Sequence, residues 1–328
     1  MYDLIIIGLG TAGINASIYA KRAGLKVAVI EMGINDFGEM SRLAEMAKPD
    51  IFIMTKIGYA HIEELGSLEG VLKAKTEAFA YMKSDGIAVM NGDDAFLMGY
   101  DSGLRRITFG LEEHNDFRAE NITAKGVESI ELDIVSETGS FPIKIPAYGS
   151  HLPGLAPAAA LIGRRLGLTD IEISRGFLSY APVDGRSNVI NPMGITLIDD
   201  CYNANPNSVK AALTSLSALK SRRVAILGDM LDMGDNSEQL HRDVGMFAAS
   251  CNIDVMVCQG EHARFIYEGF NFAGGKTAHY YKHMHELSKG INPIIKKGDA
   301  VLVKASHSMH FEQLLPIISG SDQCKKTT

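Results

Sequence analysis

Runs of apolar residues long enough for a β-strand alternate with segments of helical periodicity along nearly the whole chain. Parallel strands need long crossover connections, which helices usually supply, so this alternation predicts an α/β protein with parallel sheets. The strand-like runs are Leu4–Ile7, Val27–Ile30, Ile51–Met54, Ile87–Met90, Val224–Leu227, Val255–Cys258 and Val301–Val303. The expected helices are Ala12–Ala23, Met40–Ala47, Leu72–Met82, Pro157–Leu166, Pro206–Leu219 and Ser237–Ala249.

The pattern changes in two places. Between about residues 104 and 146, short alternating segments such as SIELDIVS predict an antiparallel patch inside or beside the first domain. The segment Ser179–Arg186 contains Pro182 and Gly185 and has the composition of a linker. A chain of 328 residues that is 46% hydrophobic can form two cores. We therefore predict a first domain over residues 1–180 and a second over residues 181–328.

Charge and cysteine content exclude several classes of protein. The net charge is −7 and no block of like charges occurs, which argues against nucleic acid as the main partner. The four cysteines form no C-x-x-C pair, which is typical of a reducing cytoplasm. The apolar opening LIIIGLG is too short to span a membrane. We expect a cytoplasmic monomer without membrane insertion.

The first 31 residues have the pattern of a dinucleotide-binding βαβ unit. Gly8, Gly10 and Gly13 follow an apolar strand and open a helix, and Glu31 ends the next strand. Such glycines let the backbone approach a pyrophosphate, and the acid binds ribose hydroxyls. This stretch resembles the start of thioredoxin-reductase-like flavoproteins, which implies FAD or NAD as a ligand. The alternative is that the glycines only allow a tight turn, because no second glycine fingerprint and no redox C-x-x-C follow.

From Glu31 to about Ile318 the sequence resembles another family, the MurF-type UDP-N-acetylmuramoyl-tripeptide–D-alanyl-D-alanine ligases of peptidoglycan biosynthesis. The phrases that carry the resemblance are EMGINDFGEMSRLAEMAKPD, MNGDD, APVDGR, IDDCYNANPNSVKAAL, ILGDMLDMGDNS and VLVKASHSMHFE. The resemblance implies a parallel-sheet central domain, whose first βαβ unit is Rossmann-like, and a smaller Rossmann-like C-terminal domain. It also implies an acyl phosphate made with ATP and Mg²⁺, with UDP-MurNAc-tripeptide and D-Ala-D-Ala as substrates.

The resemblance implies a metal site in the first domain. Glu31 and His61 match the family's magnesium ligands, and Lys75 matches a lysine that the family carbamylates. Carbamylation needs a neutral amine and produces an anion that can hold metal. The alternatives are a histidine satisfied by the fold and a solvated lysine. Lys73 lies only two residues from Lys75 and therefore faces elsewhere, so we expect it to be a solvated surface residue.

The resemblance also implies nucleotide and substrate contacts in the second domain. Arg186 matches a residue that reaches ATP phosphates, and Asp200 matches the acid that binds the ribose. The turn before the next helix carries further candidates for nucleotide and dipeptide contacts, although helix capping alone would explain one of its asparagines. The full set of candidates on this turn and on the late loop near the acceptor substrate is Tyr202, Asn203, Asn205, Lys304 and Ser306.

Three departures from the family pattern stand out. No UDP-sugar domain is found. A G-x-x-G-K-T loop is also not found, because the glycine turn at residues 8–13 in its place offers no lysine for the ATP phosphates. Gly274–Thr277 reads GGKT, but its spacing does not fit a phosphate loop. Leu152 and Leu155 replace asparagines that help to hold adenine, and Lys56 introduces a cation beside the expected metal.

We therefore expect a MurF-type ligase with impaired ligation. Two alternatives remain open. One is a nucleotide-binding module without catalysis, which would hold ATP, FAD or NAD at residues 8–13. The other is a flavoprotein–ligase fusion fragment, with a non-catalytic role beside cell-wall enzymes or with no role.

Overall fold

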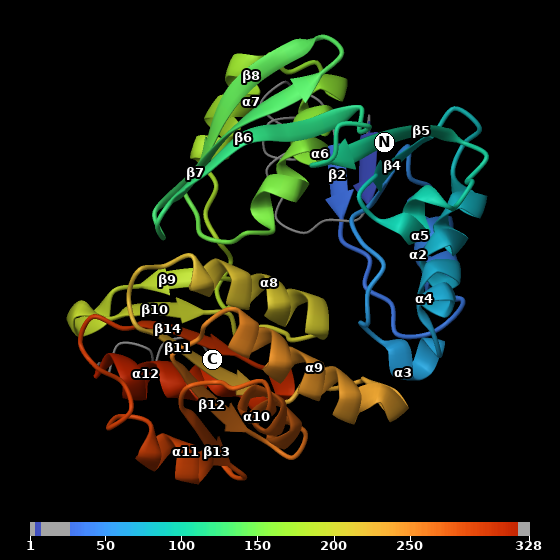
Figure 1. Ribbon diagram of the computed structural model, residues 1–328. Helices are drawn as coiled ribbons and strands as arrows, with labels where there is room; N and C mark the ends of the chain where they lie inside the picture. Colours follow the sequence, from blue (N-terminus) through green and yellow to red (C-terminus); the bar gives the residue numbers. More distant parts are fainter. Residues whose placement is uncertain (1–3, 8–26, 321–328) are drawn as a thin grey trace. The chain divides into compact units, whose positions relative to one another are not determined.

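The computed structural model describes residues 4–7 and 27–320. The chain forms two compact units (Figure 1). Unit 1 comprises Met1–Ala147 and His151–Ala181, and unit 2 comprises Tyr148–Ser150 and Pro182–Thr328. The predicted glycine turn and the helix Ala12–Ala23 lie outside the described residues.

Unit 1 contains a sheet whose described strands follow the order β2-β1-β3-β4-β5-β6-β7-β8. The first six of these strands in that order pair in parallel, and β6, β7 and β8 pair antiparallel. The α/β class with mostly parallel strands is confirmed. Their bounds are β1 Leu4–Ile7, β2 Val27–Ile30, β3 Ile51–Met54, β4 Ile87–Asn91, β5 Arg105–Gly110, β6 Phe117–Lys125, β7 Ser129–Ser136 and β8 Gly139–Ile145.

Strand β3, in the parallel part of this sheet, is buried on both faces. Phe52 and Met54 pack into a core shared with the helices α2 and α4. Ile51 and Ile53 point to the other face and pack against α6. A continuous apolar run is the signature of such a doubly covered strand. The helices of unit 1 are α2 Glu39–Ala47, α3 Ile62–Leu65, α4 Leu68–Thr76, α5 Ala95–Met98, α6 Leu152–Arg165 and α7 Asp170–Leu178, with the 3₁₀ turn η1 at Glu77–Tyr81.

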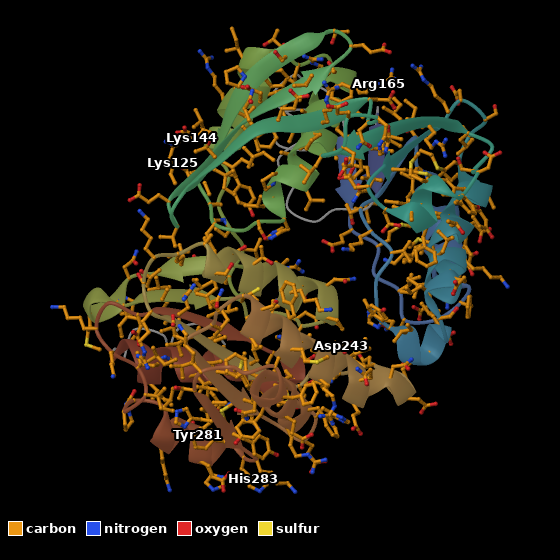
Figure 2. All side chains as sticks on the ribbon, in the orientation of Figure 1. Lys125, Lys144, Arg165, Asp243, Tyr281 and His283 are labelled. Carbon is orange, nitrogen blue, oxygen red and sulfur yellow. The ribbon has the colours of Figure 1, made fainter. Side chains whose placement is uncertain are left out.

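The antiparallel patch is shorter than predicted, because β5 pairs in parallel with β4 and belongs to the main sheet. Only β6–β8 form the antiparallel extension, whose apolar face packs on α6 and α7. On this extension Lys125 and Lys144 lie close together (Figure 2), with Nζ 3.8 Å and 3.5 Å from the carboxylate oxygens of Glu131. These cross-strand ion pairs are half-exposed and contribute little to stability.

Helix α6 begins at Leu152, five residues before the predicted start at Pro157. Pro153 lies in the first turn, where a missing N–H costs nothing. Pro157 lies inside the helix and removes one internal hydrogen bond, yet both prolines are buried in the core. Burial therefore outweighs the helix-breaking tendency on which the predicted boundary depended.

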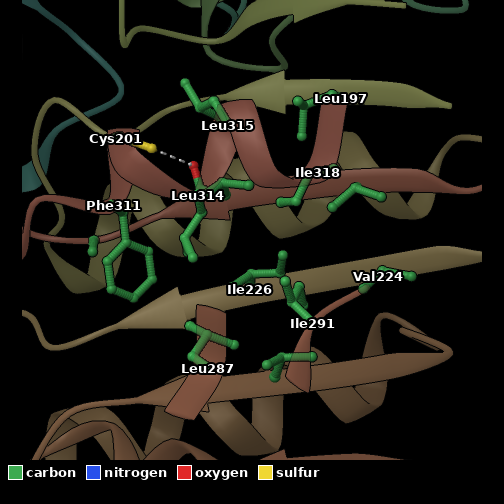
Figure 3. Close-up of a cluster of buried hydrophobic side chains, with 14 of the residues drawn as sticks. Leu197, Cys201, Val224, Ile226, Leu287, Ile291, Phe311, Leu314, Leu315 and Ile318 are labelled. Atoms are coloured by element: carbon green, nitrogen blue, oxygen red, sulfur yellow. Dashed lines mark hydrogen bonds between the residues drawn. The ribbon is translucent and has the colours of Figure 1, made fainter. Parts of the chain in front are cut away.

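Unit 2 contains a second sheet with the described order β13-β12-β11-β14-β10-β9, in which only β9 is antiparallel to its neighbour. Leu197, Val224 and Ile226 form a core with Phe311 and Leu314 (Figure 3). The strands are β9 Asn188–Ile190, β10 Thr196–Asp199, β11 Arg223–Gly228, β12 Val255–Gln259, β13 Ala278–Tyr281 and β14 Ala300–Lys304. The α-helices are α8 Pro206–Ser217, α9 Ser237–Ser250, α10 Ala263–Phe272, α11 Met284–Gly290 and α12 Leu314–Ser319. The 3₁₀ turns are η2 Pro192–Gly194, η3 Gly234–Asn236, η4 His307–Met309 and η5 Phe311–Gln313.

Across residues 4–7 and 27–320, no helix has both the length and the apolar character needed to cross a membrane.

Candidate functional site

The carboxyl ends of parallel strands share one edge of a sheet, and in open α/β sheets this edge is where ligands bind. In unit 1, Glu31 directly follows β2, and Asn91 ends β4. The Asn91 side chain donates from Nδ2 to the backbone oxygen of Thr55 at 2.8 Å. Asp94 accepts from the backbone N–H of Ile57 at 3.0 Å. These bonds tie the loops after β3 and β4 together at the edge that carries Glu31.

Lys75 and Glu31 are brought together within unit 1. Lys75 lies on α4 and is half-buried. Burial lowers the pKa of its amine, and the negative charge of Glu31 opposes this shift. A lysine whose neutral form is favoured by desolvation can act as a nucleophile, which carbamylation requires.

His61 lies at the start of α3 and adopts a left-handed backbone conformation, with φ of 57°. A positive φ is uncommon for a residue with a side chain, and such strain often accompanies function. Its ring lies close enough to the carboxylate of Glu39, at the start of α2, for an electrostatic interaction between the two side chains. The described residues contain no group of three or more His, Cys, Asp or Glu side chains arranged for a metal ion. The predicted set of Glu31, His61 and Lys75 would therefore depend on the modified lysine for its third ligand.

The two other lysines near this edge are exposed. Lys73 is exposed, with Nζ 5.7 Å from the centre of the Phe37 ring, as expected for a surface residue. Lys56 is exposed in the loop after β3. The predicted residues Gly8, Gly10 and Gly13 lie outside the described residues.

In unit 2, Asp200 and Lys304 form a buried ion pair at the carboxyl ends of β10 and β14. Lys304 Nζ lies 2.7 Å from Asp200 Oδ2 and donates to the backbone oxygen of Asn203 at 2.8 Å. Asp200 also accepts from the backbone N–H of Ser187 at 3.0 Å. Only 4% of the Lys304 side chain is exposed. The pair therefore connects three loops at this edge.

Arg186, Tyr202 and His307 form a row beside this ion pair. The Arg186 guanidinium lies 4.2 Å from the centre of the Tyr202 ring, and the rings of Tyr202 and His307 are 5.7 Å apart. Tyr202 is 47% exposed. An exposed aromatic ring next to a guanidinium suits a ligand that has both a planar group and an anionic group.

Asn205 and Ser306 are occupied by the fold itself. Asn205 caps α8, accepting from the backbone N–H of Ser208 at 2.9 Å. The buried hydroxyl of Ser306 accepts from the backbone N–H of Leu231 at 2.9 Å. For Asn205, helix capping was the alternative interpretation of the sequence, and the geometry favours it. Asn203 accepts from the N–H of its neighbour Ala204 at 2.8 Å.

A buried polar cluster at the end of β11 has no counterpart among the predicted site residues. Asp229 accepts from the backbone N–H groups of Glu261 and Ala263 at 3.1 Å and 2.6 Å, and burial raises the pKa of its carboxyl. The ring of His241 lies 5.5 Å from that of His262. One signal could have identified His241, because it shares the helical stripe of buried positions on α9 with Val244.

Two other features lie away from these residues. Lys276 of the GGKT segment pairs with Asp254 at 2.6 Å in unit 2. An open groove of about 460 Å³ lies between β6–β8 and α7 in unit 1. Its lining includes Asp133, Lys144 and Ser174 and contains none of the predicted site residues.

Two family models match most of the chain. The model of the Mur ligase middle domain matches residues 10–160. The model described as the Mur ligase glutamate ligase domain matches residues 185–307.

Curated relatives also match over most of the chain. The UDP-N-acetylmuramoyl-tripeptide–D-alanyl-D-alanine ligase of Bacillus subtilis is 30% identical over 92% of this chain. The enzyme of the same name from Escherichia coli is 31% identical over 90% of this chain. The chain spans 66% of the length of each of these two relatives.

Solved structures share the fold. MurF from Acinetobacter baumannii superposes with a TM-score of 0.86 at 23% identity, covering 97% of this chain and 76% of that one. MurF from Thermotoga maritima in complex with ADP gives 0.84 at 22% identity, covering 98% and 80%. The two domain matches, which together cover most of the chain, show that this chain belongs to the Mur ligase family.

Proposed function

We propose that this chain joins D-alanyl-D-alanine to a UDP-N-acetylmuramoyl-tripeptide with ATP, the ligation after which its curated relatives are named. The observation that carries the proposal is Lys75, a half-buried lysine whose amine has a lowered pKa beside Glu31. Buried lysines are costly, and a desolvated amine next to a carboxylate is typical of a functional site. We expect the reaction to take place in the cytosol, with the chain as a monomer.

In unit 1, Glu31, His61 and Lys75 would hold Mg²⁺. The residues fit this ion, because burial favours the neutral amine that takes up carbon dioxide, and the resulting carbamate would add an oxygen ligand to the Glu31 carboxylate. The ion would offset the repulsion between ATP phosphates and the substrate carboxylate. Glu31 is exposed and follows β2 directly, so its carboxylate is accessible to a ligand at the carboxyl edge.

In unit 2, Arg186 would bind phosphate oxygens with its guanidinium, and Tyr202 would contact the base. The proposed ribose ligand is Asp200, whose carboxylate is already held by Lys304 and by the Ser187 N–H. Asp200 balances the positive charge of Lys304. We therefore assign Lys304 to holding the turn at Asn203 rather than to binding a charged group of the substrate. Ser306 and Asn205 would act through the loops they hold.

We expect ligation to be slow. In Gly10-Thr11-Ala12-Gly13-Ile14-Asn15 the second glycine is followed by Ile14 and Asn15, where a G-x-x-G-K-T loop has lysine and threonine. That lysine neutralises the β- and γ-phosphates, and the hydroxyl is a magnesium ligand. Turnover should therefore lie below the usual range of about 1–1000 per second.

The test is a ligation assay with ATP, Mg²⁺, UDP-MurNAc-tripeptide and D-Ala-D-Ala, in which mass spectrometry quantifies the pentapeptide product. The double variant Ile14→Lys/Asn15→Thr should raise turnover, and Lys75→Ala should abolish it. Lys73→Ala is the matched control on the same helix and should leave turnover unchanged. If the double variant makes no product, or if Lys75→Ala retains full activity, the proposal is wrong. The mass of the Lys75 peptide should rise in bicarbonate and return on acidification.

A second candidate function is non-catalytic binding of a dinucleotide at residues 8–13. One observation favours it. Strand β1 lies between β2 and β3 and pairs in parallel with both, so the strand order reverses at β1. α/β proteins bind nucleotides at such a point of the sheet. Calorimetric titration with ATP, FAD and NADH separates the candidates. Tight binding of FAD or NADH without ATP binding would favour the second function.

A further inference from the structure

Helix α2 is capped by a side chain from a distant part of unit 1. Its N-cap residue is Gly38, which has φ of 81° and no side chain that could accept the free N–H groups of the first turn. Helix N-termini need such acceptors, which the N-cap residue usually supplies. Here the acceptor is the carboxylate of Glu77, 39 residues away on η1.

Glu77 makes four hydrogen bonds to this helix start. Its two carboxylate oxygens both lie 3.0 Å from the backbone nitrogen of Gly38. One of them also accepts from the backbone N–H of Ser41 at 3.2 Å and from its hydroxyl at 2.9 Å. Charge-assisted bonds at a helix N-terminus are stronger than neutral ones, since the carboxylate also faces the positive end of the helix dipole.

The bonded segments are the ones that carry Glu31 and Lys75. Glu31 begins the loop that ends at Gly38, and buried Met32 and Ile34 fix the intervening residues in the core of unit 1. Lys75 lies two residues before Glu77, at the end of α4. One carboxylate therefore joins both segments of the chain that carry the interacting pair.

We propose that Glu77 is a positioning residue, which sets the distance between Glu31 and Lys75 by tying the start of α2 to the end of α4. This inference rests on the proposed function, because a metal held by that pair gives the distance its importance. Residues behind metal ligands commonly change metal affinity by about 10–100-fold when they are replaced.

The first test measures Mn²⁺ binding to the full chain in bicarbonate buffer by electron paramagnetic resonance. The part of the Mn²⁺ binding that is lost in Glu31→Gln is the share that belongs to this site. Glu77→Gln should weaken that share by about tenfold or more, because the amide replaces one accepting oxygen with a donor that faces N–H groups. Glu69→Gln, an exposed position on α4 with the same charge change, should bind Mn²⁺ as the unmodified chain does. Ser41→Ala should give a smaller loss and is the milder variant if Glu77→Gln folds poorly. Unchanged Mn²⁺ affinity in both Glu77→Gln and Ser41→Ala would overturn the proposal.

A second measurement separates failure of this proposal from failure of the proposed function. Hydrogen exchange in peptides that cover residues 31–41 and 71–79 should become faster in both segments in Glu77→Gln and in neither in Glu69→Gln. If the unmodified chain binds no Mn²⁺ but shows this coupled change, the metal site is wrong and the tie between the segments is supported. If exchange changes in neither segment, the tie itself is wrong.

Discussion

The imidazole of His241 accepts a hydrogen bond from the backbone N–H of Met230 through Nε2, over 2.9 Å. Its other nitrogen, Nδ1, lies 2.7 Å from the backbone oxygen of Ser237 and therefore carries the proton. The residue is fully buried on α9, and burial, with a smaller contribution from His262, lowers the pKa of His241 to about 4. The fold thus requires a neutral ring, because a second proton would face the Met230 N–H.

Stability should fall as the pH is lowered from about 6.5 to 4. In the unfolded chain His241 takes up a proton near its usual pKa of 6.5, whereas the folded chain resists this until about pH 4. The unfolded state therefore binds more protons than the folded state in this window. This lowers the free energy of unfolding by about 3 kcal/mol once the pH is below both the unfolded and the folded pKa of His241. Urea unfolding at a series of pH values measures this.

The variant His241→Gln is the control for this pH effect. Glutamine can donate and accept at similar positions but does not titrate, so its unfolding free energy should vary less between pH 6.5 and pH 4 than that of the unmodified chain. Equal pH dependence in the two proteins would show that another group is responsible.

Removing the charge of Lys304 should destabilise unit 2 by about 3–5 kcal/mol, because Lys304→Met leaves Asp200 charged and largely buried without its partner. The double variant Lys304→Met/Asp200→Asn should recover part of the loss. Lys83→Met removes a pair of similar length, 2.6 Å to Asp50, whose lysine is 64% exposed, and should cost less than about 1 kcal/mol. Thermal unfolding of the four proteins would contradict this if Lys83→Met were the more damaging change.

Much of the fold could be predicted because its signals are local. The run Ile51–Met54 is apolar at every position, and the structure buries it on both faces as β3. By contrast, α10 has no counterpart among the predicted helices. It carries Gly269 in its interior and owes part of its stability to close packing on α9, a contact that no local pattern reveals. Helix α7 also has no counterpart among the predicted helices, although Thr169 and Glu172 form a capping box, whose sequence pattern is local.

The candidate site shows the same limit. Candidates such as Lys75 and Glu31 could be named together from phrases that match the family, but the contacts that hold their segments in place could not. The cap of α2 by Glu77 joins residues 39 positions apart, and Lys304 donates to the oxygen of Asn203 across 101 positions. In both cases one partner of the hydrogen bond is a backbone atom, so the side chain of that partner residue does not indicate the pairing.

The crossing of α9 and α10 should not tolerate a methyl group at Gly245. A Cβ there would clash with the backbone oxygen of Ile266, which cannot move without shifting α10. We expect Gly245→Ala to cost about 1–3 kcal/mol, as in other overpacked cores. Gly154→Ala on α6 is the matched control, because no atom lies within 4 Å of its Cβ. Alanine is the better helix former, so this variant should gain up to about 1 kcal/mol. Equal melting temperatures for the two variants would contradict the packing argument.

The described cysteines should differ sharply in their reaction with iodoacetamide. Cys258 is fully buried and Cys201 is 4% exposed, whereas Cys251 is half-buried at the end of α9. Burial raises the pKa of the Cys258 and Cys201 thiols, and the nearby carboxylates of Asp229 and Asp199 raise them further. The thiolate is the reactive form, so both access and ionisation protect these two residues. Among the three cysteines that the structure describes, peptide mapping of the native chain at pH 8 should find Cys251 modified first, with Cys201 and Cys258 modified only after urea unfolding. Early modification of Cys258 would mean that the β11–β12 core opens in the native state, since its sulfur cannot otherwise meet the reagent.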